Sequence, residues 1–298
     1  MIPIQHKIVL TFFFTLFLFL SASGQEPANN SDDERQSSNQ GSKSIKPNYR
    51  FLQGSDMLIE TAYLQDDDEL EHRFTFSRTG TRAWSFVFTE ELPLGNEKHQ
   101  LGISIPSHFL KTDAGRTRIF GDVQLGYNYS LLGGEESRFA ISPGVEMTLP
   151  TGGEREGEAS NGVGVSLNLP VSVALSDRFA SNSAFEFSYA RSARNAAGEK
   201  ADLKGFELGQ GLVWFARPKL NFVVEAIWER SQEFDDEQGR QWESELFVSP
   251  GVRWAHTFKN GLVVVPAFGV PIGFGPSRGD NRFFFSISFE HSLKRRRD

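Results

Sequence analysis

The sequence lacks several features that would point to other protein classes. It contains no cysteine, which excludes disulfides, thiolate metal sites and an acylated N-terminal cysteine. After the first 20 residues no apolar run is long enough for a transmembrane helix, and the strongest, Leu262–Phe274, is interrupted by two prolines and two glycines. The formal net charge is −7 and the only basic cluster, Lys294–Arg297, is terminal. We predict a basic tail at residues 294–298 and no nucleic-acid partner, since nucleic-acid binding needs a basic surface.

What the sequence does contain is a series of long segments that alternate between apolar and polar residues. From Ile119 to Leu131 the apolar side chains occupy odd positions, and the pattern recurs in Phe139–Leu149 and Val163–Leu175. Strict period-two alternation predicts a strand with one apolar face. Ordinary strands have about five or six residues, whereas a tilted strand needs about nine to eleven to cross a bilayer. These lengths predict transmembrane strands.

About twelve such strands are expected, an even number as in single-chain bacterial barrels. The expected strands are Glu71–Arg78, Arg82–Glu90, Lys98–Phe109, Ile119–Leu132, Arg138–Leu149, Gly162–Ser176, Phe179–Arg191, Leu203–Phe215, Leu220–Ser231, Trp242–His256, Gly261–Gly273 and Arg282–His291. Tight turns alternate with longer connections, which is the outer-membrane pattern and puts the long loops outside the cell. The predicted fold is therefore all-β, a transmembrane antiparallel β-barrel over residues 71–293 of the chain. A soluble β-sandwich, the alternative, usually has shorter strands.

The N-terminal quarter is predicted to lie outside this barrel. Residues 1–24 resemble a secretory signal peptide, with Lys7 ahead of the apolar core Ile8–Leu20 and small residues before Gln25. Residues 25–50 are polar and predict a disordered periplasmic leader. Residues 51–70 form a pre-barrel segment, within which Phe51–Gln65 could be a short helix, a strand or a plug in the lumen. An even strand count disfavours the strand.

If the apolar faces meet lipid, the opposite faces line the lumen. The residues predicted to line it are Arg73, Asp122, Gln124, Asn128, Glu146, Asn168, Glu186, Glu207, Asn221, Glu225, Glu245 and Arg253. Carboxylates outnumber guanidinium groups in this set, which predicts a pore that prefers cations and neutral solutes to anions. The alternative is that these charges pair across the lumen and only hold the barrel together. Asp122 is the strongest single candidate for a structural or gating role.

No catalytic, cofactor or metal site is predicted. The glycine-rich stretch Thr151–Glu158 lacks the spacing of a phosphate-binding loop, and Phe234–Glu237 lacks that of an EF-hand. Four histidines, His72, His99, His256 and His291, fall on apolar faces near strand ends, but no Gly-x-Ser-x-Gly elbow accompanies them. A lipid hydrolase is therefore the second hypothesis. A structural barrel with a filled interior is the third, although about twelve strands enclose a wider lumen than the eight that side chains fill.

Three runs of sequence carry a family resemblance: GDVQLGYNYSLL at 121–132, FAISPGVEMTLPTG at 139–152 and SLNLPVSVALSDRF at 166–179. They are similar to the MetA-pathway-of-phenol-degradation family of outer-membrane transporters, which is related in architecture to the fatty-acid channels. The resemblance implies passive uptake of small, often hydrophobic or aromatic, compounds across the cell outer membrane. The partners expected from this interpretation are outer-membrane lipid, a small-molecule solute and the barrel-assembly machinery, with no enzymatic activity.

Overall fold

The computed structural model describes residues 57–66, 69–79, 83–112, 115–134, 137–152, 162–194, 199–235 and 239–293. The predicted signal peptide, the leader and the basic tail lie outside these residues. Nearly all of the described chain is extended, and its one helical element is the 3₁₀ turn η1 (Gly275–Ser277). Within the described ranges no helix has the length and apolar character needed to cross a membrane.

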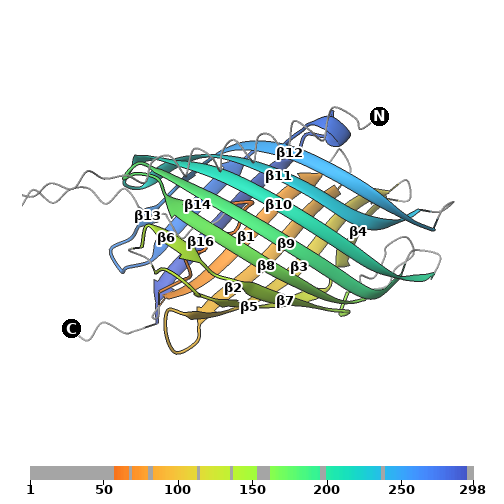
Figure 1. Cartoon of the computed structure of the whole chain (residues 1–298), viewed down its shortest axis with the longest axis horizontal. Helices are drawn as coiled ribbons and strands as arrows, with labels where there is room; N and C mark the ends of the chain where they lie inside the picture. Colours follow the sequence, from red (N-terminus) through yellow and green to blue (C-terminus); the bar gives the residue numbers. More distant parts are fainter. Residues whose placement is uncertain are drawn as a thin grey trace, which may run out of the picture. The chain divides into compact units, whose positions relative to one another are not determined.

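Sixteen strand segments make up the fold (Figure 1). They are β1 (Glu69–Thr79), β2 (Ala83–Pro93), β3 (His99–Thr112), β4 (Gly115–Phe120), β5 (Val123–Tyr129), β6 (Phe139–Ile141), β7 (Gly144–Leu149), β8 (Val163–Ala174), β9 (Phe179–Arg194), β10 (Lys200–Arg217), β11 (Leu220–Asp235), β12 (Gly239–Trp254), β13 (His256–Thr257), β14 (Val263–Gly269), β15 (Ile272–Gly273) and β16 (Phe283–Ser292). Three pairs are single strands with a break, because β4 and β5 both pair with β3, β6 and β7 with β8, and β14 and β15 with β12. With β13 as a short extension of β12, the segments form the twelve strands that the sequence predicts.

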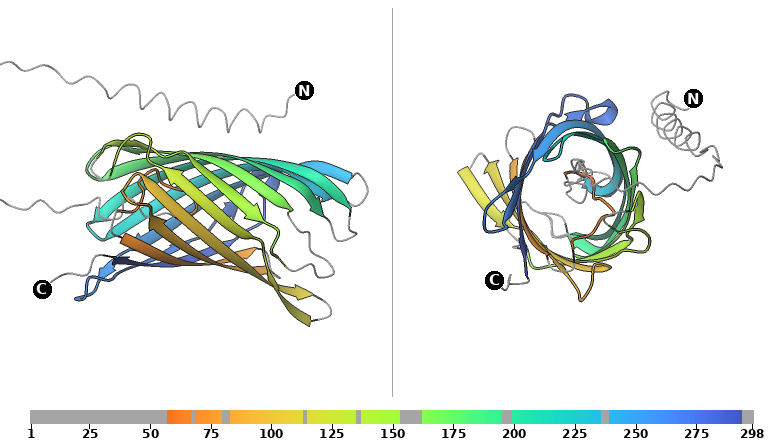
Figure 2. Two further views of the ribbon diagram at one scale, coloured as in Figure 1. Left: turned by 90° about the horizontal axis from the view of Figure 1, so that it is seen from below. Right: turned by 90° about the vertical axis from the view of Figure 1, so that its left-hand side faces the viewer.

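These strands form a closed antiparallel barrel. Each strand pairs with its neighbours in sequence, and β1 pairs with β2 on one side and with β16 on the other. The last ladder runs from Glu69 opposite Ser292 to Arg78 opposite Phe283, so the first and last strands close the sheet. Figure 2 shows the closed ring when the barrel is viewed along its axis. Closure leaves no unpaired edge, which is the condition for a sheet to cross a bilayer. The predicted fold class is confirmed.

Two of the breaks coincide with prolines. Pro143 lies between β6 and β7, and Pro271 lies between β14 and β15. Proline has no N–H to donate to a neighbouring strand, so a strand interruption at these positions costs little pairing. The third break, Gly121-Asp122, belongs to a separate motif described below. β1 and β2 pair as far as Thr79 opposite Ala83.

The alternation of the sequence separates two chemically different faces. The outward face exposes large apolar side chains such as Leu167, Leu212 and Val224, each about half exposed. The inward face carries buried polar groups, including Glu71, Glu225 and Arg253, each no more than 3 % exposed. A protein in water would expose the second set and bury the first. The exposed apolar surface is therefore the lipid-facing wall of an outer-membrane barrel.

Candidate functional site

The described segment ahead of β1, Met57–Asp66, runs inside the barrel without regular secondary structure (Figure 2). At its first end, the backbone N–H groups of Leu58 and Ile59 donate to Oε1 of Glu225 on β11, at 3.2 and 3.1 Å. The Glu225 carboxylate is 3 % exposed. A buried carboxylate needs hydrogen-bond donors to offset its lost hydration, and here the segment supplies two of them.

Glu60 holds the middle of the segment to the opposite wall. Nδ2 of Asn128 on β5 donates to its Oε1 at 2.8 Å, and Nδ2 of Asn168 on β8 donates to its Oε2. Two residues later, both the N–H and the carbonyl of Ala62 are hydrogen-bonded to serine side chains. Its N–H donates to Oγ of Ser172 at 2.9 Å, and its carbonyl accepts from Oγ of Ser142 at 2.6 Å. Both serines are fully buried.

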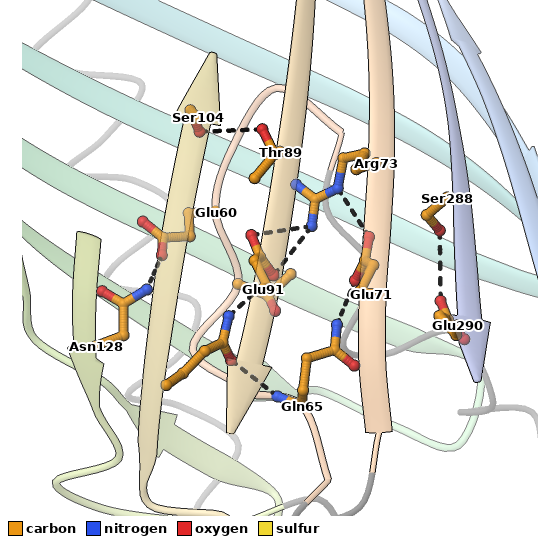
Figure 3. A network of polar contacts seen from close by, with 12 residues as sticks. Glu60, Gln65, Glu71, Arg73, Thr89, Glu91, Ser104, Asn128, Ser288 and Glu290 are labelled. Atoms are coloured by element: carbon orange, nitrogen blue, oxygen red, sulfur yellow. Dashed lines mark hydrogen bonds and ion pairs between the residues drawn. The ribbon is translucent and has the colours of Figure 1, made fainter. Parts of the chain in front are cut away.

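The last part of the segment is bound to the walls next to β1 (Figure 3). The N–H of Gln65 donates to Oε1 of Gln100 on β3 at 3.0 Å, and its side-chain amide donates to Glu71 on β1. The hydroxyl of Tyr63 donates to the carbonyl of Ser137 at 3.0 Å. Met57–Asp66 is thus hydrogen-bonded to β1, β3, β5, β8 and β11, and it crosses the lumen from one wall to the other.

Inward glycines make room for this segment. A Cβ added at Gly209 would lie 3.0 Å from Ile59 Cγ1, and one added at Gly251 would clash with the end of the Met57 side chain. By its lack of a side chain, an inward glycine could simply leave open space in the lumen. The structure shows instead that Gly209 and Gly251 accept side chains of the inner segment, so close packing explains glycine at both positions.

Two cavities border the inner segment, and Leu58 contributes to both. One has a volume of about 320 Å³ and combines apolar walls from Ile227, Phe247 and Phe284 with the carboxylates of Glu207, Glu229 and Glu245. The other, of about 240 Å³, is more polar and is lined by Glu60, Arg73, Glu91, Asn128, Glu146 and Asn168. The lumen therefore holds space on both sides of the inner segment, with different chemistry in each.

Four carboxylates form a continuous row across β9 to β12. Glu186 is opposite Glu207, Glu207 is opposite Glu229, and Glu229 is opposite Glu245 in the strand register. Like charges directly opposite one another on neighbouring strands are destabilising. At the end of the row, Arg282 donates to both Glu245 oxygens at 2.8 Å and to Asp280. We call Glu186, Glu207, Glu229 and Glu245 the carboxylate row.

A second charged cluster lies on β1 and β2 (Figure 3). Nε of Arg73 donates to Glu71 at 2.9 Å, and its NH2 group lies 3.4 Å from each Glu91 oxygen. Nε2 of Gln100 completes the cluster by donating to Glu91 at 2.9 Å. Here the charges are paired, as the alternative interpretation of the lumen residues expects. Arg73 thus serves both carboxylates of this cluster, whereas Arg282 contacts one of the four in the carboxylate row, so the two halves of the lumen differ electrostatically.

The other predicted lumen residues lie as follows. Gln124 is on the inward face of β5, between Ser104 of β3 and Thr148 of β7. Asn221 and Arg253 are buried opposite each other on β11 and β12. Asp122, at the break between β4 and β5, does not line either cavity. Its Oδ1 accepts the N–H of Gly152 at 2.8 Å, while the N–H of neighbouring Val123 donates to Thr151 Oγ1 at 2.9 Å.

Two stretches within the family-like runs, Gly121-Asp122 and Leu149-Pro150-Thr151-Gly152, thus form a single structural unit. The first precedes β5 and the second begins at the last residue of β7, and the two strands pair with Val123 opposite Leu149. A Cβ at Gly152 would lie 2.8 Å from Asp122 Oδ1, so only glycine allows this approach without rearrangement. The unit fixes the point where the chain leaves β7 for the connection that follows.

The four histidines lie on the outside of the barrel at the end with the short turns. His72 stacks on Phe88 and lies 5.3 Å from His291, His99 Nδ1 lies 2.7 Å from the Tyr127 hydroxyl, and His256 packs edge-on against Phe258. These are contacts of an interfacial aromatic belt. Among the described residues no group of three or more histidines and carboxylates is arranged to hold a metal ion.

Sequence reasoning did not identify Glu60, Gln65, Gln100, Ser142 and Ser172, which fix the inner segment. Gln100, Ser142 and Ser172 do sit at inward positions of the alternation, so their parity was available as a signal. Nothing in the pattern of Met57–Asp66, however, indicates which wall residues it meets. Those pairs are separated by up to 167 positions in the chain.

Solved structures with the same fold are outer-membrane proteins. The COG4313 outer membrane channel from Pseudomonas putida F1 is 14 % identical, with a TM-score of 0.53 over 77 % of this chain and 97 % of that one. The NanC porin is 11 % identical, with a TM-score of 0.50 over 76 % of this chain and all of that one. At such identities the similarity concerns the fold. No curated protein matches the chain. The family model described as "Putative MetA-pathway of phenol degradation" matches residues 34–278, and the chain belongs to this family of outer-membrane β-barrel proteins.

Proposed function

We propose that the protein is a passive channel for small, often hydrophobic or aromatic, solutes across the outer membrane. The observation that carries the proposal is the lumen, which holds a cavity of about 320 Å³ with both apolar and carboxylate walls. An aromatic ring fits a cavity lined by Ile227, Phe247 and Phe284, since ligand sites are mostly apolar with a few polar groups that set orientation. A barrel with a fully packed interior, the structural alternative, would have no such space.

The carboxylate row supports a preference among these solutes. Four acidic side chains follow one another on adjacent strands, with Arg282 at one end. A ring of carboxylates favours cations in channels. Solutes that carry a positive charge, followed by neutral ones, should therefore pass faster than anions of the same size.

We further propose that Met57–Asp66 acts as a plug. It crosses the lumen, borders both cavities and is held by hydrogen bonds to five strands. Each single hydrogen bond contributes only about 0.5–1.5 kcal/mol, or up to about 3 when a charged group takes part. The segment has no helix or ladder of its own to oppose its release, so displacement from the wall would open the path between the cavities.

An enzymatic role is the weaker candidate. The histidines that a lipid hydrolase would need are engaged with aromatic partners on the outer surface, and His72 additionally lies 3.6 Å from Glu90. We propose that they position the barrel in the bilayer. Insertion by the barrel-assembly machinery and contact with outer-membrane lipid are part of the same proposal, as expected of a barrel in this membrane.

Transport is tested with three solutes that share a phenyl ring but differ in charge. Proteoliposomes would be incubated with benzyltrimethylammonium, phenyl glucoside or benzenesulfonate in the external buffer, and uptake would be followed for each. The proposal expects uptake in the order cation, neutral, anion. No uptake of any solute above that of empty liposomes would favour a filled barrel. Release of fatty acid from the liposomes, abolished by His256→Ala, would replace the channel with a hydrolase.

A further inference from the structure

A basic patch lies on the outward face of β9 to β12, at the end away from the short turns. It consists of Arg191, Lys204, Arg230 and Arg240, all of which are exposed. Lys204 is opposite Tyr189 in the register, and Arg230 is opposite the outward-facing Phe206. The patch therefore belongs to the face that meets lipid and does not contribute to the lumen.

Three cations of the patch lie beyond outward aromatic residues of their own strands, on the side away from the short turns. Lys204 is two residues from Phe206, Arg191 is four from Phe187, and Arg240 is two from Trp242. Phe206 packs against Phe187 and Trp242, with ring centroids 5.2 and 6.1 Å away, and the other belt at the short turns contains Trp214 and Phe222. Eight positions separate Trp214 from Phe206. At about 3.3 Å per residue and a tilt of about 45°, this is roughly 19 Å along the membrane normal, near the ~25 Å apolar band of such barrels. Lys204 and the residues farther from the short turns are then at the level of the lipid head groups.

The charge of the patch is not balanced by the wall around it. Among the described outward positions of β9 to β12, the one carboxylate is Asp202. Its Oδ2 accepts from the Tyr189 hydroxyl at 2.8 Å and its Oδ1 from the Ser192 N–H at 3.0 Å. The Arg240 guanidinium donates to the Asp202 carbonyl at 3.0 Å. One carboxylate with both oxygens engaged leaves an excess of positive charge at this site.

The aromatic neighbours hold one of these cations in place. The Arg230 guanidinium lies 5.5 Å from the centroid of the Trp242 ring, a cation–π arrangement. The same pairing recurs around the barrel, with Arg78 over Trp84 at 5.4 Å and Arg118 over Phe120 at 4.5 Å. At the short-turn end the aromatic belt pairs instead with histidines. The two ends of the barrel thus differ in the cationic partners of their aromatic side chains.

We infer that this basic patch binds the phosphate groups of a phosphorylated glycolipid in the outer leaflet, with the acyl chains lying along the aromatic wall below. Lys and Arg side chains bind phosphate oxygens through charge-assisted hydrogen bonds. The site occupies the outer wall, so it acts independently of solute passage through the lumen. Its occupant is a lipid because Arg191, Lys204 and Arg240 lie beyond outward aromatic residues on the lipid-facing wall, and those aromatic side chains have no use in binding a soluble phosphate.

The test is binding of lipid A to the detergent-purified protein, counted by native mass spectrometry. Diphosphorylated lipid A should bind, and the same lipid without its phosphates should bind at least about fivefold more weakly. The double variant Lys204→Glu with Arg230→Glu should bind diphosphorylated lipid A roughly 25-fold more weakly, since each basic residue near a charged lipid surface contributes about a factor of five. Inorganic phosphate should not displace the lipid.

The matched control reverses two charges at the other end of the barrel, with Arg217→Glu and Lys259→Glu, and should bind like the unmodified protein. Equal affinity for the phosphorylated and dephosphorylated lipid would overturn the inference, as would an equal loss in the control. If the charge-reversed variant does not fold, as judged by heat-modifiable gel mobility, Lys204→Gln with Arg230→Gln replaces it. Benzyltrimethylammonium uptake should be unchanged in these variants, which separates failure of this inference from failure of the proposed channel.

Discussion

At the scale of single residues, the most informative contact joins Asp122 to the Gly152 N–H. Asp122 is 8 % exposed, so an unsatisfied partner left by its removal would cost about 1–3 kcal/mol. We predict that Asp122→Ala loosens the chain where it leaves β7. Trypsin cleavage at Arg155, in the connection that follows, should then become faster in the folded, bilayer-inserted protein.

The control for this prediction is Asp122→Asn, which keeps an oxygen acceptor for the Gly152 N–H and should be cleaved nearly as slowly as the unmodified barrel. Gly152→Ala places a Cβ 2.8 Å from Asp122 Oδ1 and should resemble Asp122→Ala. Equal cleavage rates in all three variants would mean that the contact does not hold the connection in place.

At the residue level the sequence predicts the direction of a side chain but not its partners. The alternation predicts Glu225 and Arg253 as inward, because parity along a strand depends only on neighbours in sequence, and both side chains are buried. It could not give the two backbone N–H groups that Glu225 accepts, which lie 166 and 167 positions away. Parity likewise predicts that Asp122 faces the lumen. It lies one residue before β5, however, and its side chain accepts the Gly152 N–H.

At the scale of elements, the strands were predictable and the inner segment was not. Each of the twelve strands carries its own period-two pattern, which places it without knowledge of the rest. Pro143 and Pro271 lie at two of the breaks, but Pro170, Pro250 and Pro266 lie within continuous strands, so proline alone does not locate the breaks. Met57–Asp66 has no periodicity because its conformation is set by wall residues on five strands. Helix, strand and plug were therefore all compatible with its sequence.

The absence of cysteine allows a direct test of the inner segment. A Cβ at Gly209 would lie 3.0–3.3 Å from the γ and δ carbons of Ile59, the positions that Sγ of a cysteine at 59 would approach, so the two sulfurs would lie within reach of each other. We predict that Ile59→Cys with Gly209→Cys forms a disulfide that holds the segment against β10. Solute uptake should fall under oxidising conditions and return on reduction, measured in proteoliposomes with benzyltrimethylammonium.

Ile59→Cys alone serves as the control and should show no dependence on redox conditions. A complementary variant, Glu225→Ala, removes the acceptor of two segment N–H groups and should raise uptake and single-channel conductance. If the oxidised and reduced double variants transport equally, the segment does not need to leave the wall, and the plug proposal is wrong. The channel proposal would then stand with a fixed constriction.

At the scale of the whole molecule, the barrel separates its charges by location. Inside, β1 and β2 carry paired charges around Arg73, while β9 to β12 carry the carboxylate row. Outside, cations gather above the aromatic belt at one end. The same four strands thus present carboxylates to the solute and guanidinium and ammonium groups to lipid. Because neighbouring residues on a strand point to opposite faces, both surfaces can be varied separately.

Arg282 offers the simplest test of the inner charge. Its guanidinium neutralises Glu245, with NH2 at 2.8 Å from both carboxylate oxygens. We predict that Arg282→Gln raises the preference for cations, because it leaves the carboxylate row without this counter-charge. The reversal potential across a planar bilayer with a KCl gradient should move further toward the potassium equilibrium potential. A shift toward the chloride equilibrium potential would contradict the assignment of this pair to the conduction path.

Removing the carboxylate row should have the opposite effect. We predict that Glu186→Gln, Glu207→Gln and Glu229→Gln together move the reversal potential toward zero, because negative charge leaves the lumen while the amides keep the shape of the side chains. The barrel should also become more stable to unfolding, since like charges on neighbouring strands no longer repel each other. Glu90→Gln is the matched control, as this carboxylate lies outside the barrel beside His72. An unchanged reversal potential in the triple variant would show that ions pass elsewhere, and an equal change in Glu90→Gln would assign selectivity to surface charge.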